Sequence, residues 1–162
     1  MIIHVKNKNT LIIEDFNLKC CIGRNGITSN KKEGDFSTPK GLFKLEKLYF
    51  RKDRVGIPTC IIKKKKITKN LAWCDDPIHK KYNEEIQNFN KNYKENFFRK
   101  DHTYDYIITI NHNKKKTPYK GSAIFIHLTN NYKATAGCIA LKKKDFEILL
   151  KLVNQKTKIK IG

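Results

Sequence analysis

The chain has 162 residues and a formal net charge of +20, with 35 lysine and arginine residues against 15 aspartate and glutamate residues. This length predicts a single domain over residues 1–162, and no apolar run approaches the roughly 18 residues that a membrane-spanning helix requires. The 5 cysteines form an odd set without CxxC spacing, which argues against a structural zinc site and against a disulfide framework.

The first part of the chain is predicted to be β structure. Ile2–Val5 and Leu11–Glu14 have the pattern of a hairpin around a polar turn at Asn7–Asn9, and Leu18–Arg24 has that of a third strand. A glycine-rich loop follows, and it leads into a strand that alternates over residues 42–47.

The later part of the chain is predicted to combine buried strands with one helix. Residues 83–100 are polar with scattered aromatics, which predicts irregular or weakly helical structure. Tyr106–Ile110 and Ala123–Leu128 are apolar and β-branched enough to form buried central strands. Apolar residues at helical spacing predict an amphipathic helix over Lys142–Val153. Thr157–Ile161 alternates as an edge strand would, with its lysines towards water.

A histidine and a cysteine mark a candidate active site. His127 lies in an apolar strand, and Cys138 follows Gly137 in a predicted tight turn. An imidazole beside a thiol can take its proton, and a glycine before the nucleophile lets backbone amides face the oxygen of an attacked carbonyl. The pairing indicates acyl transfer by a cysteine nucleophile. Considered alone, Cys138 could also be a buried, inert thiol, and His127 a histidine of the core.

Four blocks extend this interpretation over most of the chain. They are Gly34–Phe43, Trp73–Pro77 with Tyr82–Asn83, Gly121–His127 and Thr135–Leu141. In this order and spacing they resemble the L,D-transpeptidase catalytic domain, the YkuD-like family, in its smaller branch with a WCDDP segment. The resemblance implies a mainly β fold: a β-sandwich-type mixed sheet with a C-terminal helix and short irregular or helical insertions.

The resemblance also implies a reaction, on peptidoglycan stem tetrapeptides and without a cofactor or metal. Cys138 is the expected nucleophile, which forms a thioester and releases D-alanine, and His127 is the expected base. The amides of Gly137 and Cys138 are expected to hold the oxyanion, and Thr135 matches a hydroxyl residue often found three before the cysteine. An amine of another stem then accepts the acyl group, in 3-3 cross-linking or a related exchange.

Other positions in these blocks depart from the family pattern or have structural roles. Ala136 stands where many members carry histidine or arginine, and Ala140 where many carry a polar residue, so auxiliary polar help is missing. This leaves the acyl acceptor open. Asp35, Thr38 and Pro39 are expected to be turn residues that shape the sheet under the active site.

The WCDDP segment is expected to lie near the catalytic cleft. Cys74–His79 contains three kinds of metal-ligating residue, but Asp-Asp-Pro favours a turn and no second ligand pair stands at zinc-like spacing. We therefore expect no metal. The resemblance instead suggests that Trp73 packs at the cleft and that Asp75 or Asp76 meets an amine of the substrate.

Three functions follow from these observations: a transpeptidase, an L,D-carboxypeptidase that uses water as the acceptor, and a noncatalytic basic module that binds wall or nucleic acid. Lysine supplies nearly all the positive charge and is spread along the chain, so the charge indicates no specific nucleic-acid partner. The implied substrate places the protein in the periplasm or cell envelope. Because the chain shows no signal peptide, a cytoplasmic location stays open. A monomer is expected.

Overall fold

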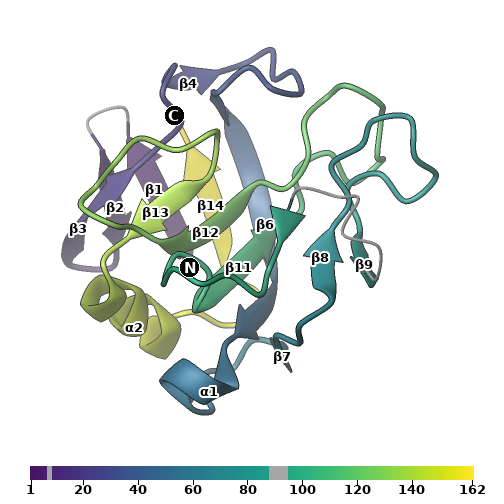
Figure 1. Cartoon of the computed structure of the whole chain (residues 1–162). Helices are drawn as coiled ribbons and strands as arrows, with labels where there is room; N and C mark the ends of the chain where they lie inside the picture. The colour runs from purple at the N-terminus through teal and green to yellow at the C-terminus, as the bar shows by residue number, and fades with distance from the viewer. Residues whose placement is uncertain (7–8, 88–94) are drawn as a thin grey trace.

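A computed structural model describes residues 1–6, 9–87 and 95–162. The described structure is mainly β, as predicted, and Figure 1 shows its arrangement. The strands are β1 (Ile2–Lys6), β2 (Thr10–Ile13), β3 (Phe16–Cys21), β4 (Ile27–Thr28), β5 (Thr38–Pro39), β6 (Gly41–Phe50), β7 (Lys64–Lys66), β8 (Leu71–Trp73), β9 (Glu85–Gln87), β10 (Glu95–Asn96), β11 (Tyr106–Ile110), β12 (Phe125–Leu128), β13 (Ile139–Leu141) and β14 (Lys158–Ile161). The helices are α1 (Lys52–Val55) and α2 (Lys143–Leu152).

The largest sheet closes on itself. Its strand order is β11-β12-β13-β3-β2-β1-β14-β6-β7, and β11 pairs with β6 as well as with β12. The pairs β1–β14, β12–β13 and β6–β7 are parallel, whereas the other neighbours run antiparallel. The sheet is therefore mixed, in agreement with the expected fold.

The core comes from alternate residues of the strands and from one face of α2. Ile3 and Val5 of β1, with Ile159 of β14, are almost completely buried. Phe146 of α2 joins this core and stacks on Tyr106, with ring centroids 5.2 Å apart. The predicted helix is confirmed within one residue at each end. In the ranges described, no helix is long and apolar enough to cross a membrane.

The expectation of a C-terminal edge strand is wrong. β14 lies inside the sheet, parallel to β1 and antiparallel to β6. Its lysines, Lys158 and Lys160, are exposed while Ile159 and Ile161 are buried, so the faces were predicted correctly. Alternation fixes which side chains face the core, but the neighbours of a strand depend on segments distant in sequence.

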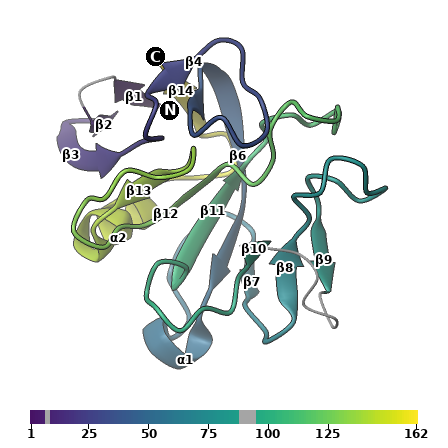
Figure 2. The same cartoon turned by 45° about the horizontal axis from the view of Figure 1, so that its top comes forward.

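The expectation for residues 83–100 is partly wrong, because only residues 83–84 and 97–100 of the described parts are irregular. The described parts contain strands rather than helix, since β9 and β10 flank β8 in a small antiparallel sheet. Residues 88–94 lie outside the described residues, as do residues 7 and 8 of the predicted polar turn. Figure 2 shows the small sheet on the β7 side of the large one.

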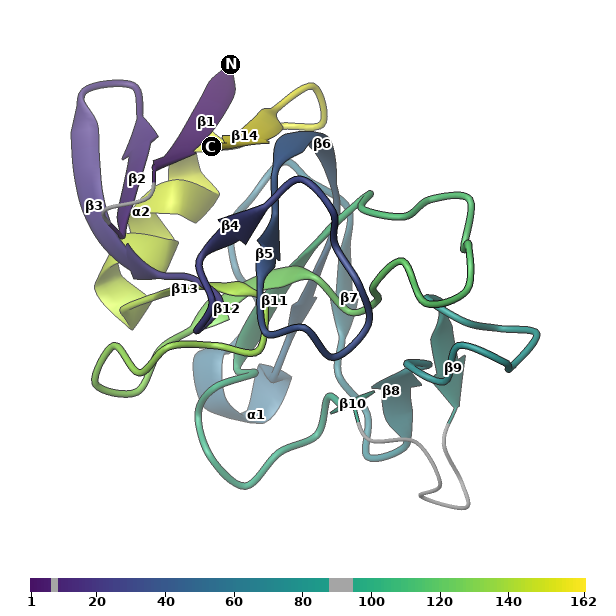
Figure 3. The same cartoon turned by 90° about the horizontal axis from the view of Figure 1, so that it is seen from above.

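A short parallel pair connects the first part of the chain to the candidate site. β4 pairs with β5, and Figure 3 shows this pair and the loop between them in front of the large sheet. Thr38 of β5 makes the contact, because its buried hydroxyl donates to the carbonyl of Gly137 over 2.9 Å. The loop of residues 29–37 is thereby held against the turn that carries Cys138.

Candidate active site

β12 and β13 bring His127 and Cys138 to one face of the sheet. The strands are parallel neighbours, with Ile126 opposite Ile139, and both isoleucines belong to the central core. Because side chains alternate along a strand, His127 and Cys138 point to the opposite face. Both line a pocket of about 430 Å³.

His127 is buried and has a defined tautomer. Its Nδ1 lies 2.8 Å from the carbonyl oxygen of Leu128. Because a carbonyl oxygen only accepts, Nδ1 carries the proton and Nε2 is left as the basic nitrogen. Burial lowers the pKa of His127 to about 4, so the imidazole is neutral at neutral pH, as a general base must be.

Cys138 rests as a thiol. Its sulfur accepts a hydrogen bond from the amide of Phe125 over 3.3 Å and donates one to the carbonyl of Ala123 over 3.2 Å. Burial raises the pKa of Cys138 to about 12. The thiol proton thus points at a backbone carbonyl in this structure, and rotation about the Cβ–Sγ bond is needed to pass it to His127.

Thr135 and Gly137 set the shape of the turn. The Thr135 hydroxyl donates to the carbonyl of Cys138 over 2.6 Å and accepts from the amide of Gly137 over 3.1 Å. Gly137 has φ 147°, and a Cβ there would lie 2.9 Å from the carbonyl oxygen of Ser37. Since the Gly137 amide is engaged by Thr135, the Cys138 amide is the better candidate for the predicted oxyanion hole.

The residues of the WCDDP segment separate in space. Asp75 lines the pocket that contains the thiol. Asp76 instead accepts a hydrogen bond over 3.1 Å from the backbone two residues ahead, as in a turn. Trp73 stacks on Phe97 and lines a neighbouring groove of about 740 Å³. Of the three expected substrate contacts, the structure brings only Asp75 into this pocket.

The sequence interpretation did not name five polar residues that line the pocket: Lys31, Glu33, Glu95, Tyr104 and Ser122. The Tyr104 hydroxyl donates to Glu95 over 2.7 Å, and the Tyr104 ring meets that of His127 edge-on, with centroids 5.3 Å apart. Burial raises the pKa of Glu95. Lys31 and Glu33 lie just before the Gly34–Phe43 block, and this position was the only sequence signal for them. Glu95 and Tyr104 lie outside all four blocks, so no sequence signal pointed to them.

Comparison with known proteins identifies a family to which the chain is similar. A model of the L,D-transpeptidase catalytic domain, YkuD, matches residues 2–161. No curated protein and no solved structure matches the chain. The matched range includes every residue named above as lining the pocket.

Proposed function

The chain belongs to the L,D-transpeptidase catalytic domain family, and from this premise we propose that it transfers acyl groups between peptidoglycan stem peptides through Cys138. One observation carries the proposal: His127 of β12 and Cys138, directly before the parallel neighbour β13, line one pocket. A cysteine nucleophile needs a base within the same site. The proposed substrate implies action in the cell envelope.

The proposed reaction has two acyl transfers. His127 Nε2 takes the thiol proton, and the Cys138 sulfur attacks the carbonyl carbon of the third stem residue. The Cys138 amide donates to the resulting oxyanion, and losing such a donor typically costs about two to three orders of magnitude in rate. Collapse breaks the bond to D-alanine, whose amine receives the proton from His127, and leaves a thioester.

An amine of a second stem then attacks the thioester. Its proton passes to His127, and the sulfur leaves and regains a proton, so the thiol is restored. Asp75 lines the pocket and is the proposed contact for an ammonium group of the substrate. Thr135 keeps the turn in shape through its two hydrogen bonds. Water in place of the amine gives the carboxypeptidase reaction.

The test is incubation of the purified protein with disaccharide tetrapeptides, followed by mass analysis of the products. A cross-linked dimer with loss of one D-alanine supports the proposal, whereas a shortened monomer alone identifies a carboxypeptidase. Cys138→Ala is the control and is expected to form neither product while it melts as the wild type does. Unchanged substrate with folded wild-type protein would favour a noncatalytic module.

A second measurement reports on the nucleophile directly. The family resemblance implies that a carbapenem acylates Cys138, which adds the mass of the drug to the intact protein. Cys138→Ala removes the proposed nucleophile and keeps the other 4 of the 5 cysteines. Labelling of the wild type but not of this variant is the expected result, and equal labelling of both would contradict it.

A further inference from the structure

A buried lysine lies beside the proposed nucleophile. Lys31 belongs to the loop between β4 and β5, and it lines the same pocket as Cys138. It is 8% exposed and is the only buried lysine among the described residues. Burial of a lysine ammonium is costly unless its charge is used or compensated, so its position requires an explanation.

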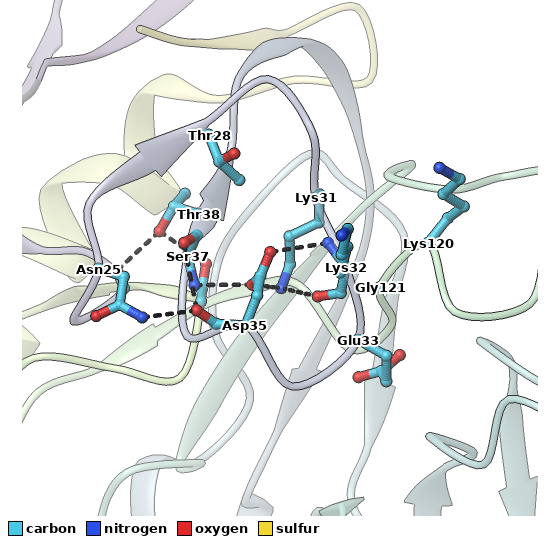
Figure 4. A network of polar contacts seen from close by, with 12 residues as sticks. Asn25, Thr28, Lys31, Lys32, Glu33, Asp35, Ser37, Thr38, Lys120 and Gly121 are labelled. Carbon is cyan, nitrogen blue, oxygen red and sulfur yellow. Dashed lines mark hydrogen bonds and ion pairs between the residues drawn. The ribbon is translucent and has the colours of Figure 1, made fainter.

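The loop holds the Lys31 ammonium with two acceptors, as Figure 4 shows. Nζ donates to Asp35 Oδ1 over 2.5 Å and to the carbonyl of Lys32 over 2.9 Å. Asp35 is itself fixed, because it accepts from the amides of Lys32 and Ser37 over 2.8 and 2.9 Å. An ammonium has three N–H donors, and the described residues supply acceptors for two of them.

Two glycines give Lys31 access to the catalytic turn. A Cβ at Gly121 would lie 2.9 Å from Lys31 Cγ, so the absence of a side chain there makes room for the lysine stem. A Cβ at Gly137 would lie 3.7 Å from Lys31 Nζ. The ammonium therefore adjoins the residue directly before Cys138.

The pocket contains more carboxylates than cations, which suggests a role for the Lys31 ammonium. Glu33, Asp75 and Glu95 also line the pocket, and Lys31 is the only lysine or arginine among the described lining residues. A thiolate formed there would face carboxylates, and like charges at short range disfavour ionisation. Although Lys31 is paired with Asp35, its fixed ammonium offsets part of this repulsion.

We propose that the Lys31 ammonium stabilises the negative charge that forms on Cys138, and then on the attacked carbonyl oxygen, during acyl transfer. The inference rests on the proposed role of Cys138 as nucleophile. His127 moves the proton, whereas Lys31 keeps all of its protons and acts through its charge. In the free protein, burial and Glu95 raise the pKa of Cys138, whereas the hydrogen bond from the Phe125 amide and, to a smaller extent, Lys31 lower it.

Alkylation of Cys138 by iodoacetamide, followed over a range of pH, tests the proposal without peptidoglycan. The rate follows the thiolate fraction, and peptide mass analysis separates Cys138 from the other cysteines. Lys31→Met and Lys31→Gln remove the charge, and the glutamine also keeps two N–H donors. Both are expected to raise the kinetic pKa by about one unit and to slow alkylation about tenfold at neutral pH. Lys31→Arg is expected to restore most of the rate.

Two controls accompany these variants. Lys120→Met removes an equal charge from a neighbouring, exposed lysine and is expected to leave the profile of Cys138 unchanged. Alkylation of half-buried Cys60, outside the pocket, is expected to be the same in every variant.

A folded Lys31→Met or Lys31→Gln protein whose Cys138 profile equals that of the wild type would overturn the proposal. Loss of folding in both neutral variants would assign Lys31 to loop structure and overturn it too. Since the measurement needs no stem peptide, a protein that fails to cross-link can still show the Lys31 effect. A protein that cross-links can likewise lack the Lys31 effect. The proposal for Lys31 and the proposed transpeptidase function can therefore each fail without the other.

Discussion

Burial keeps both His127 and Cys138 uncharged in the free protein. It lowers the pKa of the imidazole to about 4 and raises that of the thiol to about 12. The neutral imidazole can accept a proton, but a thiolate is not present beforehand. In the proposed reaction, proton transfer is therefore expected to accompany the arrival of the substrate, whose carbonyl takes up the negative charge.

The lowered pKa of His127 predicts acid sensitivity. Between the ordinary value of 6.5 and about 4, the unfolded chain binds a proton that the folded protein excludes. Stability is then lost as pH falls through this window, by about 2 kcal/mol between neutral pH and about pH 5. Burial also lowers the pKa of His112, which adds a loss of the same sign.

Urea unfolding at several pH values measures this effect. His127→Gln removes the titrating group, so the slope of stability against pH is expected to flatten, whatever the stability of the variant at neutral pH. His4→Gln is the matched control, because His4 is only half buried in β1. A wild-type slope that survives in His127→Gln would contradict the assignment.

Gly137 permits a backbone shape that no other residue can adopt without strain. We expect Gly137→Ala to destabilise the fold, because its Cβ would lie 2.9 Å from the backbone oxygen of Ser37 at a positive φ of 147°. Gly26→Ala is the control, since Gly26 has φ 76° and open space around it. The control is expected to cost about 1–2 kcal/mol, and Gly137→Ala about 1–3 kcal/mol more. Equal midpoints in urea would show that the close contact is relieved.

Among the elements, the β4–β5 pair supports the turn that carries Cys138. Thr38 of β5 is completely buried. Its hydroxyl accepts from the amide of Gly23 over 2.8 Å and donates to the carbonyl of Gly137 over 2.9 Å. This side chain connects three segments that are distant in sequence, and so it positions the turn of Cys138. The expectation that Thr38 and Pro39 are turn residues is wrong, because both lie in β5. The contacts of Thr38 with Gly23 and Gly137 fit the other part of that expectation, a role in shaping the site.

Thr38→Val tests this support. The change removes both hydrogen bonds at nearly constant volume, and each buried group left without a partner costs roughly 1–3 kcal/mol. Turnover is expected to fall more than stability alone explains, because a displacement of about 1 Å can cost about a hundredfold in rate. Thr28→Val is the control, since the Thr28 hydroxyl accepts from the exposed amide of Asn30, which water can satisfy. Equal behaviour of the two variants in urea and in turnover would refute a supporting role.

Elements were predictable where their signal is local. An apolar, β-branched run predicted the strand Tyr106–Ile110, whose residues are all buried. Helical spacing of apolar residues predicted the helix Lys142–Val153. The neighbours of β14 were not predictable, since its pairing with β1 joins the two ends of the chain. The two-residue strand β10 carries too few residues for a period.

The candidate site shows the same division. His127 and Cys138 stand in sequence blocks that resemble a family, so they could be named from the sequence, although their roles stay predictions. Lys31 could not be singled out, because a position shortly before the Gly34–Phe43 block does not distinguish one lysine from the many others in this chain. Its burial depends on Gly121 and Gly137, which only the folded structure brings to it.

At the scale of the whole molecule, closure of the sheet stabilises the folded state, whereas the net charge destabilises it. The closed order of strands, of which β11 and β14 are members, buries a continuous apolar core. Figure 1 shows the strands of this sheet. With a net charge of +20, the positively charged side chains repel one another when the chain is compact, and this repulsion destabilises the fold. Exposed ion pairs such as Arg99–Asp101 offset little of this, since each contributes about 0–1 kcal/mol.

Salt is therefore expected to stabilise the protein. Raising sodium chloride from about 10 mM to about 150 mM shortens the screening length from about 30 Å to about 8 Å, which weakens repulsion across the whole surface. Salt also weakens the exposed ion pairs, but the excess of cations makes repulsion stronger than the attraction within these pairs. A rise of a few degrees in the melting temperature is expected, with glucose at equal osmolarity as the control. The same screening is expected to weaken any attraction of the protein to a carboxylate-rich wall. A fall in melting temperature with salt would mean that attraction within the ion pairs outweighs repulsion from the net charge.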